Sequence, residues 1–221
     1  MIMYTSLIAD VPTEVKVLGI VVVGAALVFG LMKKKRSKTS TKVIKPFPVE
    51  LPLSGSASGL GGMLIDAQHL MHVTHWPDVT GQEVWFTGED GTRVSRTVVE
   101  KIVLAEKQGP DLCLLKLDEP LDPTNHKILE IDKARVDDKL TILRLDRLPF
   151  GTYVKQVKGG IISARSGGAN SEIRSGDSGK AWLVQRSGNI RIVSLTSKGY
   201  NGEGPDLHHF KQSMLDVING V

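Results

Sequence analysis

The 221 residues can form one or two domains with a buried core, and 41% hydrophobic and 24% charged residues are ordinary proportions for a globular protein. The single cysteine, Cys113, excludes an intramolecular disulfide and favours a reducing compartment. Seven Lys or Arg residues and no acid lie within residues 33–45, so the net charge of +4 becomes −2 for the chain from Pro46 onward. This balance argues against a basic nucleic-acid-binding body, and no nucleic-acid partner is expected.

An apolar segment precedes these cations. Residues 17–32 read VLGIVVVGAALVFGLM, and Lys16 and Lys33 can snorkel to extend this run toward the length of a membrane span, about 20 residues. A signal peptide would carry its cations before the apolar run, and the polybasic flank disfavours a buried core helix. We therefore expect a short N-terminal segment at 1–14, one transmembrane helix at 15–32 and a polybasic juxtamembrane linker at 33–53 that also contacts anionic lipid. By the positive-inside rule, the chain is expected to be a single-pass membrane protein with its C-terminal domain on the cytoplasmic side.

Short β-rich segments separated by turn residues follow from residue 54 onward, and this pattern predicts a sandwich or barrel. Only the end of the chain has helical spacing, with Leu207, Phe210 and Met214 at i, i+3 and i+7. The sequence therefore predicts an all-β domain that closes with a helix at about 206–219. The expected strands include residues 62–65, 83–87, 98–104, 112–117, 139–145, 153–163, 181–185 and 190–197.

The most informative motif is SGDSGK at residues 175–180. Its glycines, Gly176 and Gly179, let the backbone approach a substrate closely and can turn amides toward a developing oxyanion. Ser178 is presented between them as a nucleophile. A serine is a weak nucleophile by itself, so a base and an orienting acid are needed.

Candidates for both partners lie upstream. His75 ends the stretch GGMLIDAQHLMHVTH, and Asp111 opens the apolar run DLCLLKL, where burial of a carboxylate requires hydrogen bonds. Asp78 and Asp90 are other possible acids, but neither opens an apolar strand.

Two more histidines, His69 and His72, form a His-x-x-His-x-x-His run with His75. Strand alternation would place His72 on the opposite face from the other two, and no cluster of acids or cysteines completes a zinc site. No metal is therefore expected, and His69 and His72 are interpreted as incidental neighbours of the base.

The stretches around His75, Asp111 and Ser178 together resemble those of the chymotrypsin-fold serine proteases, in which the base, acid and nucleophile follow in this chain order. GGMLI…VTHW resembles the strand that leads to their catalytic histidine, DLCLLKL the strand opened by their aspartate, and GDSG their nucleophile loop. IVSLTSKG at residues 192–199 resembles the strand that lines their substrate cleft, and residues 207–218 resemble their closing helix. The resemblance covers about residues 54–221.

This resemblance implies two six-stranded antiparallel β-barrels of chymotrypsin type, at about residues 54–125 and 135–205, and a serine endopeptidase that needs no cofactor. It implies that Ser178 attacks the scissile carbonyl, that His75 transfers the proton, and that Asp111 holds the tautomer of His75. The backbone amides of Gly176 and Ser178 would form the oxyanion hole.

The resemblance also implies where a polypeptide substrate binds. The main chain of Ser194, Leu195 and Thr196 would pair with an extended substrate. Glu172, six positions before the nucleophile, would form the floor of the S1 pocket and favour Lys or Arg at P1. In the alternative, an acidic or amide P1 side chain is held by Arg174, Lys198 or Thr196.

The chain departs from the family in several ways. Lys180 stands where glycine is common, and the cysteine bridges of secreted members are absent. Asp177, which pairs with a new N-terminus in zymogen-type relatives, must have another partner or await cleavage of the linker. With the apolar segment, these departures resemble viral proteases, such as those of sobemovirus-like and astrovirus-like architecture, that process polyproteins on host membranes.

We therefore expect a membrane-anchored viral serine endopeptidase that acts on a polyprotein. Two alternatives are a catalytically silent membrane-tethered scaffold with a protease fold and a bacterial envelope protease of the heat-shock type. The second of these would place the domain outside the cytoplasm, against the charge bias of residues 33–45.

Overall fold

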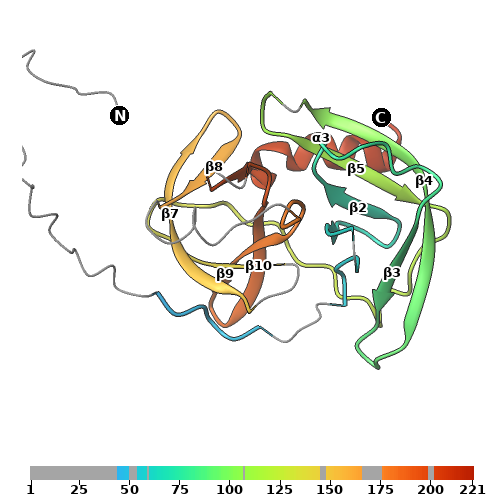
Figure 1. Cartoon of the computed structure of the whole chain (residues 1–221), viewed down its shortest axis with the longest axis horizontal. Helices are drawn as coiled ribbons and strands as arrows, with labels where there is room; N and C mark the ends of the chain where they lie inside the picture. The colour runs from blue at the N-terminus through green and yellow to red at the C-terminus, as the bar shows by residue number, and fades with distance from the viewer. Residues whose placement is uncertain are drawn as a thin grey trace, which may run out of the picture. The chain divides into compact units, whose positions relative to one another are not determined.

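A computed structural model describes residues 44–49, 54–58, 60–106, 108–144, 148–165, 176–198 and 202–221 (Figure 1). These residues all belong to one compact unit, Thr41–Val221. The transmembrane helix expected at residues 15–32 lies outside the described residues. Within the described part of the chain, no helix has the length and apolar character needed to cross a membrane.

The first of two curled sheets has five antiparallel strands in the order β1-β2-β5-β4-β3. The long strand β4 pairs with β3 through its first residues and with β5 through the rest, so it bends around one side of the sheet (Figure 1). The strands are β1 (Met63–Leu64), β2 (His69–His72), β3 (Glu83–Thr87), β4 (Arg93–Ala105) and β5 (Leu112–Leu117).

A short segment at residues 54–58 joins the two edges of this sheet. Ser56 bridges to Met63 in β1, and Ser58 bridges to Trp85 in β3. The amide of Ser58 donates to the carbonyl of Trp85 at 2.7 Å, and the amide of Leu64 donates to the carbonyl of Gly55 at 2.9 Å. The sheet has five strands rather than the six expected, and these two bridges stand in the place of a sixth.

The second sheet has six antiparallel strands in the order β10-β9-β6-β7-β8-β11. One strand was expected over residues 153–163, but the chain turns back at Gly159 and Gly160, whose φ angles are 58° and 74°. Two central residues with positive φ fit a tight hairpin turn. The strands are β6 (Lys139–Ile142), β7 (Phe150–Lys158), β8 (Ile161–Ala164), β9 (Ala181–Arg186), β10 (Asn189–Leu195) and β11 (Glu203–Pro205).

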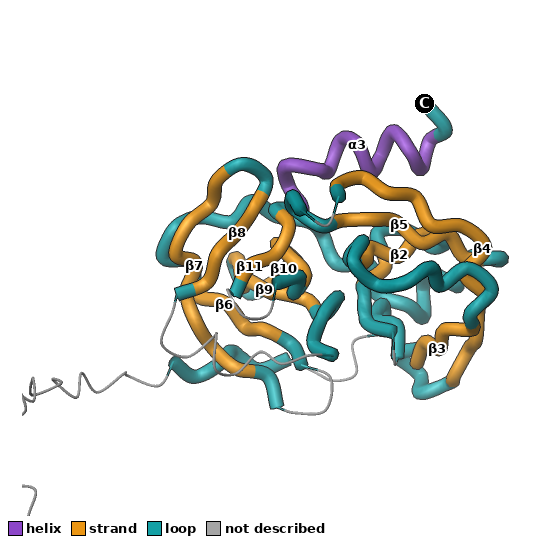
Figure 2. The backbone as a smooth tube through the Cα atoms, turned by 45° about the horizontal axis from the view of Figure 1, so that its top comes forward, coloured by secondary structure: helices purple, strands orange, loops and turns teal. Residues whose placement is uncertain are grey.

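The edges of the second sheet also meet. The hydroxyl of Ser194 in β10 donates to the carbonyl of Pro205 in β11 at 2.7 Å. Lys198 and Glu203 form an antiparallel bridge beside this contact. The fold is therefore mostly β, with two curled antiparallel sheets and a C-terminal helix (Figure 2).

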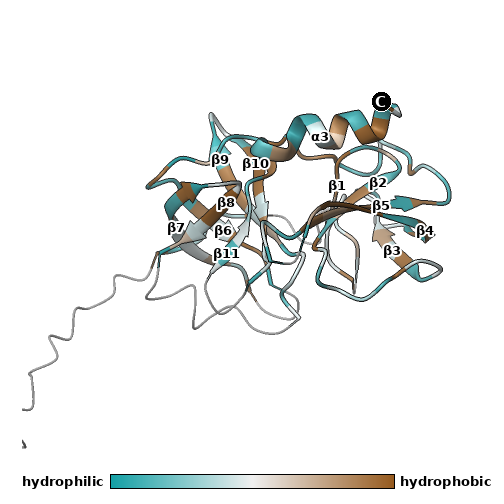
Figure 3. Cartoon of the chain, turned by 90° about the horizontal axis from the view of Figure 1, so that it is seen from above, coloured by the Kyte–Doolittle hydropathy of each residue, from teal (hydrophilic) through white to brown (hydrophobic). Residues whose placement is uncertain are grey.

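Strands β5 and β9 are apolar on both faces because each lies between two cores. Cys113, Leu115 and Leu117 face the core enclosed by the first sheet, whereas Leu112 and Leu114 face a cluster shared by both sheets. β5 is accordingly among the most apolar segments in Figure 3. In β9, Trp182 and Val184 face the core of the second sheet, whereas Ala181 and Leu183 face the shared cluster.

We call this shared group the joint cluster. Strand alternation places one row of each of these two strands in it, so burial of apolar surface holds the two sheets together. Its buried residues are Phe47, Met63, Met71, Val73, Leu112, Leu114, Leu129, Ile131, Leu143, Ala181, Leu183, Ile192, Leu195, Leu207 and Met214.

The terminal helix α3 (Leu207–Asn219) confirms the helix expected at residues 206–219. The carboxylate of Asp206 accepts from the amide of His208 at the N-terminus, and Gly220 ends the helix with a φ of 70°. Its apolar face packs against β4 and β10, so the helix touches both sheets.

Residues 44–49 lie against the second sheet. The amide of Phe47 donates to the hydroxyl of Thr141 in β6 at 3.0 Å, and the Phe47 ring belongs to the joint cluster. A methyl group at Gly151 in β7 would overlap the carbonyl of Ile44, so glycine permits this close approach. The packed domain therefore includes residues that precede the expected boundary at residue 54.

Candidate active site

Three loops from both sheets place His75, Asp111 and Ser178 side by side. His75 lies on the turn that follows β2, and Asp111 immediately precedes β5. Because β2 and β5 are paired antiparallel neighbours, the end of one lies beside the start of the other. Ser178 comes from the loop before β9 in the second sheet, 103 residues from His75 along the chain.

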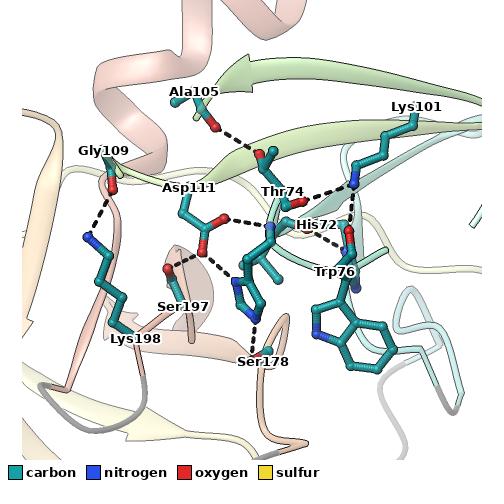
Figure 4. Close-up of polar contacts among 12 residues, drawn as sticks. His72, Thr74, Trp76, Lys101, Ala105, Gly109, Asp111, Ser178, Ser197 and Lys198 are labelled. Carbon is teal, nitrogen blue, oxygen red and sulfur yellow. Dashed lines mark hydrogen bonds and ion pairs between the residues drawn. The ribbon is translucent and has the colours of Figure 1, made fainter. Parts of the chain in front are cut away.

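The imidazole of His75 contacts both partners. Its Nδ1 lies 2.6 Å from Oδ2 of Asp111, and its Nε2 lies 3.1 Å from Oγ of Ser178 (Figure 4). An ionised carboxylate only accepts hydrogen bonds, so Nδ1 carries the proton in this arrangement and the neutral Nε2 can accept from the hydroxyl. The His75 side chain is 25% exposed, whereas that of Asp111 is 1% exposed.

Asp111 is buried but surrounded by donors. The backbone amide of His75 donates to Oδ1 at 2.9 Å, and the hydroxyl of Ser197 donates to Oδ2 beside the ring of His75 (Figure 4). These bonds offset the cost of burying a carboxylate. The residue has a φ of 61°, a conformation that Asp adopts more readily than most side chains.

The loop that carries Ser178 is held from both sides. The amide of Gly62 donates to the carbonyl of Gly179 at 2.9 Å, and the amide of Gly179 donates to the carbonyl of Thr196 at 2.8 Å. Gly176 and Gly179 have φ angles of 94° and 82°, which favour glycine. Among the described residues, the amides of Gly176 and Ser178 have no hydrogen-bond acceptor, so both are available to an oxyanion.

The other two histidines of the run have structural partners. The ring of His69 bonds to the carboxylate of Asp66 at 2.8 Å. His72 is buried, with its ring nitrogens 3.1 Å and 3.2 Å from the carbonyls of Val73 and Leu60 and its ring edge against Trp76. Burial lowers the pKa of His72, and the nearby charge of Lys101 acts in the same direction. No group of three potential metal ligands occurs among the described residues.

His72 also lies against the loop that carries Ser178. A methyl group at Gly179 would lie 3.1 Å from Nε2 of His72. His72 therefore packs against the loop that carries Ser178, and it is not an incidental neighbour as the sequence pattern indicated.

Of the expected substrate-binding residues, Glu172 lies outside the described residues, as does Arg174 in the alternative assignment. Ser194, Leu195 and Thr196 are buried. Both main-chain groups of Thr196 are engaged, because its amide donates to the carbonyl of Lys180 and its carbonyl accepts from Gly179. The amide of Thr196 is therefore already used within the chain, and the expected pairing of these three residues with a substrate stays a prediction.

The residues that follow them lie nearer to the site. Ser197 contacts Asp111, and the ammonium of Lys198 donates to the carbonyl of Gly109 at 3.3 Å (Figure 4). Lys198 thereby links the second sheet to the loop that carries Asp111. The sequence predicts neither contact. For the first, the motif SLTS at residues 194–197 does not specify which of its two serines faces the carboxylate of Asp111.

Lys180 and Asp177, which lie on either side of Ser178 and were named above as departures from the family, are both buried. Burial lowers the pKa of the Lys180 ammonium, and the opposite charge of Asp177 partly counteracts this shift. The amide of Lys180 also donates to the carbonyl of Asp177 at 3.1 Å, which tightens the turn around Ser178.

Cys113, two residues from Asp111, is fully buried in the core of the first sheet. Burial raises the pKa of its thiol to about 12, so it is unreactive at neutral pH. Asp78 and Asp90 accept from Thr80 and Thr92 in exposed turns and lie outside this constellation.

No family model matches the chain. Over 125 residues it is 31% identical to the large ribosomal subunit protein uL2 of Orientia tsutsugamushi (strain Ikeda), an overlap that covers 50% of this chain and 45% of that protein. The chain thus spans less than half of the length of this curated relative.

Proposed function

We propose that the chain is a serine endopeptidase of the chymotrypsin type, with Ser178 as nucleophile, His75 as general base and Asp111 as orienting acid. The observation that carries the proposal is the pair of hydrogen bonds from one imidazole, at 2.6 Å to Asp111 and 3.1 Å to Ser178. A nucleophile, a base and a group that orients the base, all within hydrogen-bond reach, are the requirements for activating a serine.

In this mechanism, Ser178 Oγ attacks the scissile carbonyl while Nε2 of His75 takes its proton. The imidazolium is stabilised by the buried carboxylate of Asp111, which Ser197 and the amide of His75 hold in place. The tetrahedral oxyanion is bound by the amides of Gly176 and Ser178. His75 then donates its proton to the leaving amine, and water hydrolyses the acyl-enzyme by the same steps in reverse.

The architecture supports the same proposal. Each curled sheet has its edges brought together, the first by residues 54–58 and the second by the contact between β10 and β11. Two such sheets with the site at their joint are compatible with the chymotrypsin-type double barrel, and we propose that fold in its full form.

The remaining parts of the proposal rest on the sequence. Residues 15–32 would anchor the enzyme in a membrane with residues 33–53 as a basic flank and the domain on the cytoplasmic side. A viral polyprotein is the proposed substrate. Its P1 side chain would be Lys or Arg or, in the alternative, an acidic or amide side chain.

A ribosomal role is the alternative that the similarity to uL2 raises. Binding to ribosomal RNA requires a surplus of Lys and Arg on the folded body, whereas residues from Pro46 onward carry a net charge of −2.

A silent scaffold would keep the fold without activity, and an envelope protease would keep the activity on the other side of the membrane.

The test is cleavage of a peptide library by the full chain purified in detergent. We expect Ser178→Ala to abolish cleavage, whereas Ser213→Ala, at an exposed serine of α3, should leave the rate unchanged. Cleavage that survives Ser178→Ala would refute the assignment of the nucleophile. An inactive unmodified chain that reacts with no serine-directed probe would favour the scaffold. If the chain is active, the library also gives the P1 preference.

A further inference from the structure

The turn that carries His75 has an unusual support. The ammonium of Lys101, on strand β4, donates to the carbonyl of Thr74 at 2.9 Å and to the carbonyl of Trp76 at 2.8 Å (Figure 4). These are the residues on either side of His75. One cation therefore holds the backbone both immediately before and immediately after the proposed base.

The support is anchored in a rigid element. Lys101 lies opposite Leu115 in the paired register of β4 and β5, and β5 is the strand that Asp111 opens. A second bond comes from the same strand, because the hydroxyl of Thr74 donates to the carbonyl of Ala105 at 2.8 Å. The base is thus positioned from β4, and the acid from β5, its neighbour in the sheet.

The two carbonyls depend on this lysine. Residues 74–76 form a turn outside the ladder of β2, so their backbone groups lack strand partners. Among the described residues, no other donor reaches the carbonyls of Thr74 and Trp76. An ammonium has three donors on a flexible stem, which lets one side chain satisfy both oxygens.

We propose that Lys101 is a positioning residue that sets the backbone of His75, and through it the distances from the imidazole to Asp111 and to Ser178. This inference rests on the proposed function where it concerns rate, but the geometry of the His75–Asp111 pair can be measured without any reaction. Among the described residues, the hydrogen bonds of the Lys101 ammonium go to the two carbonyls of this turn.

The first test compares Lys101→Met, which keeps the stem and removes the donors, with Lys101→Arg, which keeps donors. Labelling of the full chain by a fluorophosphonate should be roughly 10- to 100-fold slower in Lys101→Met, because displacing a catalytic group by about 1 Å has effects of this size. Lys101→Arg should recover most of the rate. Lys116→Met removes a half-buried lysine of the same sheet and should label like the unmodified chain.

The second test reads the geometry directly. The Nδ1 proton shared between His75 and Asp111 should give a low-field proton NMR signal in the unmodified chain and in Ser178→Ala. The signal should disappear in Lys101→Met and persist in Lys101→Arg and Lys116→Met. A Lys101→Met variant that keeps both the signal and the labelling rate would overturn the proposal, since water would then satisfy the two carbonyls equally well.

Chemical rescue separates positioning from folding. Lys101→Cys can be alkylated with bromoethylamine, which rebuilds a side chain of lysine length with a terminal ammonium. Cys113 should not interfere, because burial raises the pKa of its thiol to about 12. Return of the NMR signal supports the proposal, and its continued absence in a folded, alkylated protein contradicts it. If the unmodified chain shows the signal but no labelling, the proposed function fails while the role of Lys101 remains measurable.

Discussion

The two halves of the domain contribute to the site in different ways. The half around the first sheet holds both His75 and Asp111, whose side chains and backbone are already bonded to each other. The half around the second sheet brings Ser178 and Ser197. The proposed acid and base therefore form a pair within one half, whereas the proposed nucleophile reaches them only when the halves are packed together.

The halves also differ in charge. Residues 54–125 hold eleven Asp or Glu against five Lys or Arg, a net charge of −6. Residues 126–221 hold fifteen Lys or Arg against ten Asp or Glu, a net charge of +5. Opposite charges favour association of the halves, but the joint cluster is apolar, so burial of hydrophobic surface is the main source of their cohesion. The proposed chemistry therefore depends on packing between the halves as well as within each.

The largest expected effect comes from breaking the pair inside the first half. Asp111→Asn should lower kcat by about 10⁴-fold, because an amide cannot hold the tautomer of His75 that accepts a proton from Ser178. Asn tolerates the φ of 61° at this position, so the thermal unfolding temperature should change little. Asp118→Asn, in the same half but away from the site, is the control and should keep its activity. An Asp111→Asn variant within tenfold of the unmodified rate would contradict the assignment of the acid.

A second prediction concerns how each half closes. Gly55 lies in the segment that joins the edges of the first sheet, and a methyl group added there would overlap the carbonyl of Lys127. Gly204 lies in β11 of the second sheet, and a methyl group added there would overlap the carbonyl of Leu195. Gly55→Ala and Gly204→Ala should each lower the free energy of unfolding by about 3 kcal/mol, measured by urea denaturation.

The matched control for both is Gly91→Ala, at a turn with open space and a φ of 82°. It should cost about 1 kcal/mol through backbone strain alone. Equal stability of the three variants would show that the two closures do not constrain the halves.

A smaller effect is expected from His72, which lies in the first half against the loop of the second half that carries Ser178. Its pKa is lowered by burial from the ordinary value of 6.5, so below pH 6.5 the unfolded chain binds this proton more readily than the folded one. The stability contributed by the neutral ring is fully present above pH 6.5 and is lost as the pH falls toward the lowered pKa. The slope is at most about 1.4 kcal/mol per pH unit for one proton.

The measurement is urea denaturation at several pH values between about 5 and 8, the range in which histidine titrates. His72→Gln should have a flatter pH dependence of stability than the unmodified chain, whereas His208→Gln, at an exposed position of α3, should not differ from it. A His72→Gln variant with an unchanged slope would show that His72 does not titrate on unfolding.

Sequence patterns predict the bounds of a strand correctly where the hydrophobic pattern of the segment matches its burial in the fold. Strands Glu83–Thr87 and Leu112–Leu117 were predicted with the bounds observed, because alternation marks the first and burial on both faces makes the second continuously apolar. The strand expected at residues 153–163 is instead two strands, since Gly159 and Gly160 form a tight turn between two β-rich segments. The closing segment at residues 54–58 makes single bridges and leaves no pattern of its own.

At the site, three short motifs were enough to single out His75, Asp111 and Ser178, which the structure places in contact. The contacts of Ser197 with Asp111 and of Lys101 with the turn of His75 could not be predicted in the same way. They join residues 86 and 25 to 27 positions apart and depend on strand register, which one sequence does not specify. The same ambiguity of register applies to Ser194, Leu195 and Thr196, whose pairing with a substrate stays a prediction.

The most direct test is to locate the serine that reacts. The full chain is incubated with a fluorophosphonate, digested and analysed by mass spectrometry, with the chain carrying His75→Ala treated in parallel. Adduct on Ser178 alone, lost in His75→Ala, is the predicted result, because among the described residues Ser178 is the serine whose hydroxyl lies within hydrogen-bond reach of a histidine. Adduct on another serine, or equal labelling without His75, would contradict the proposal that this site activates Ser178.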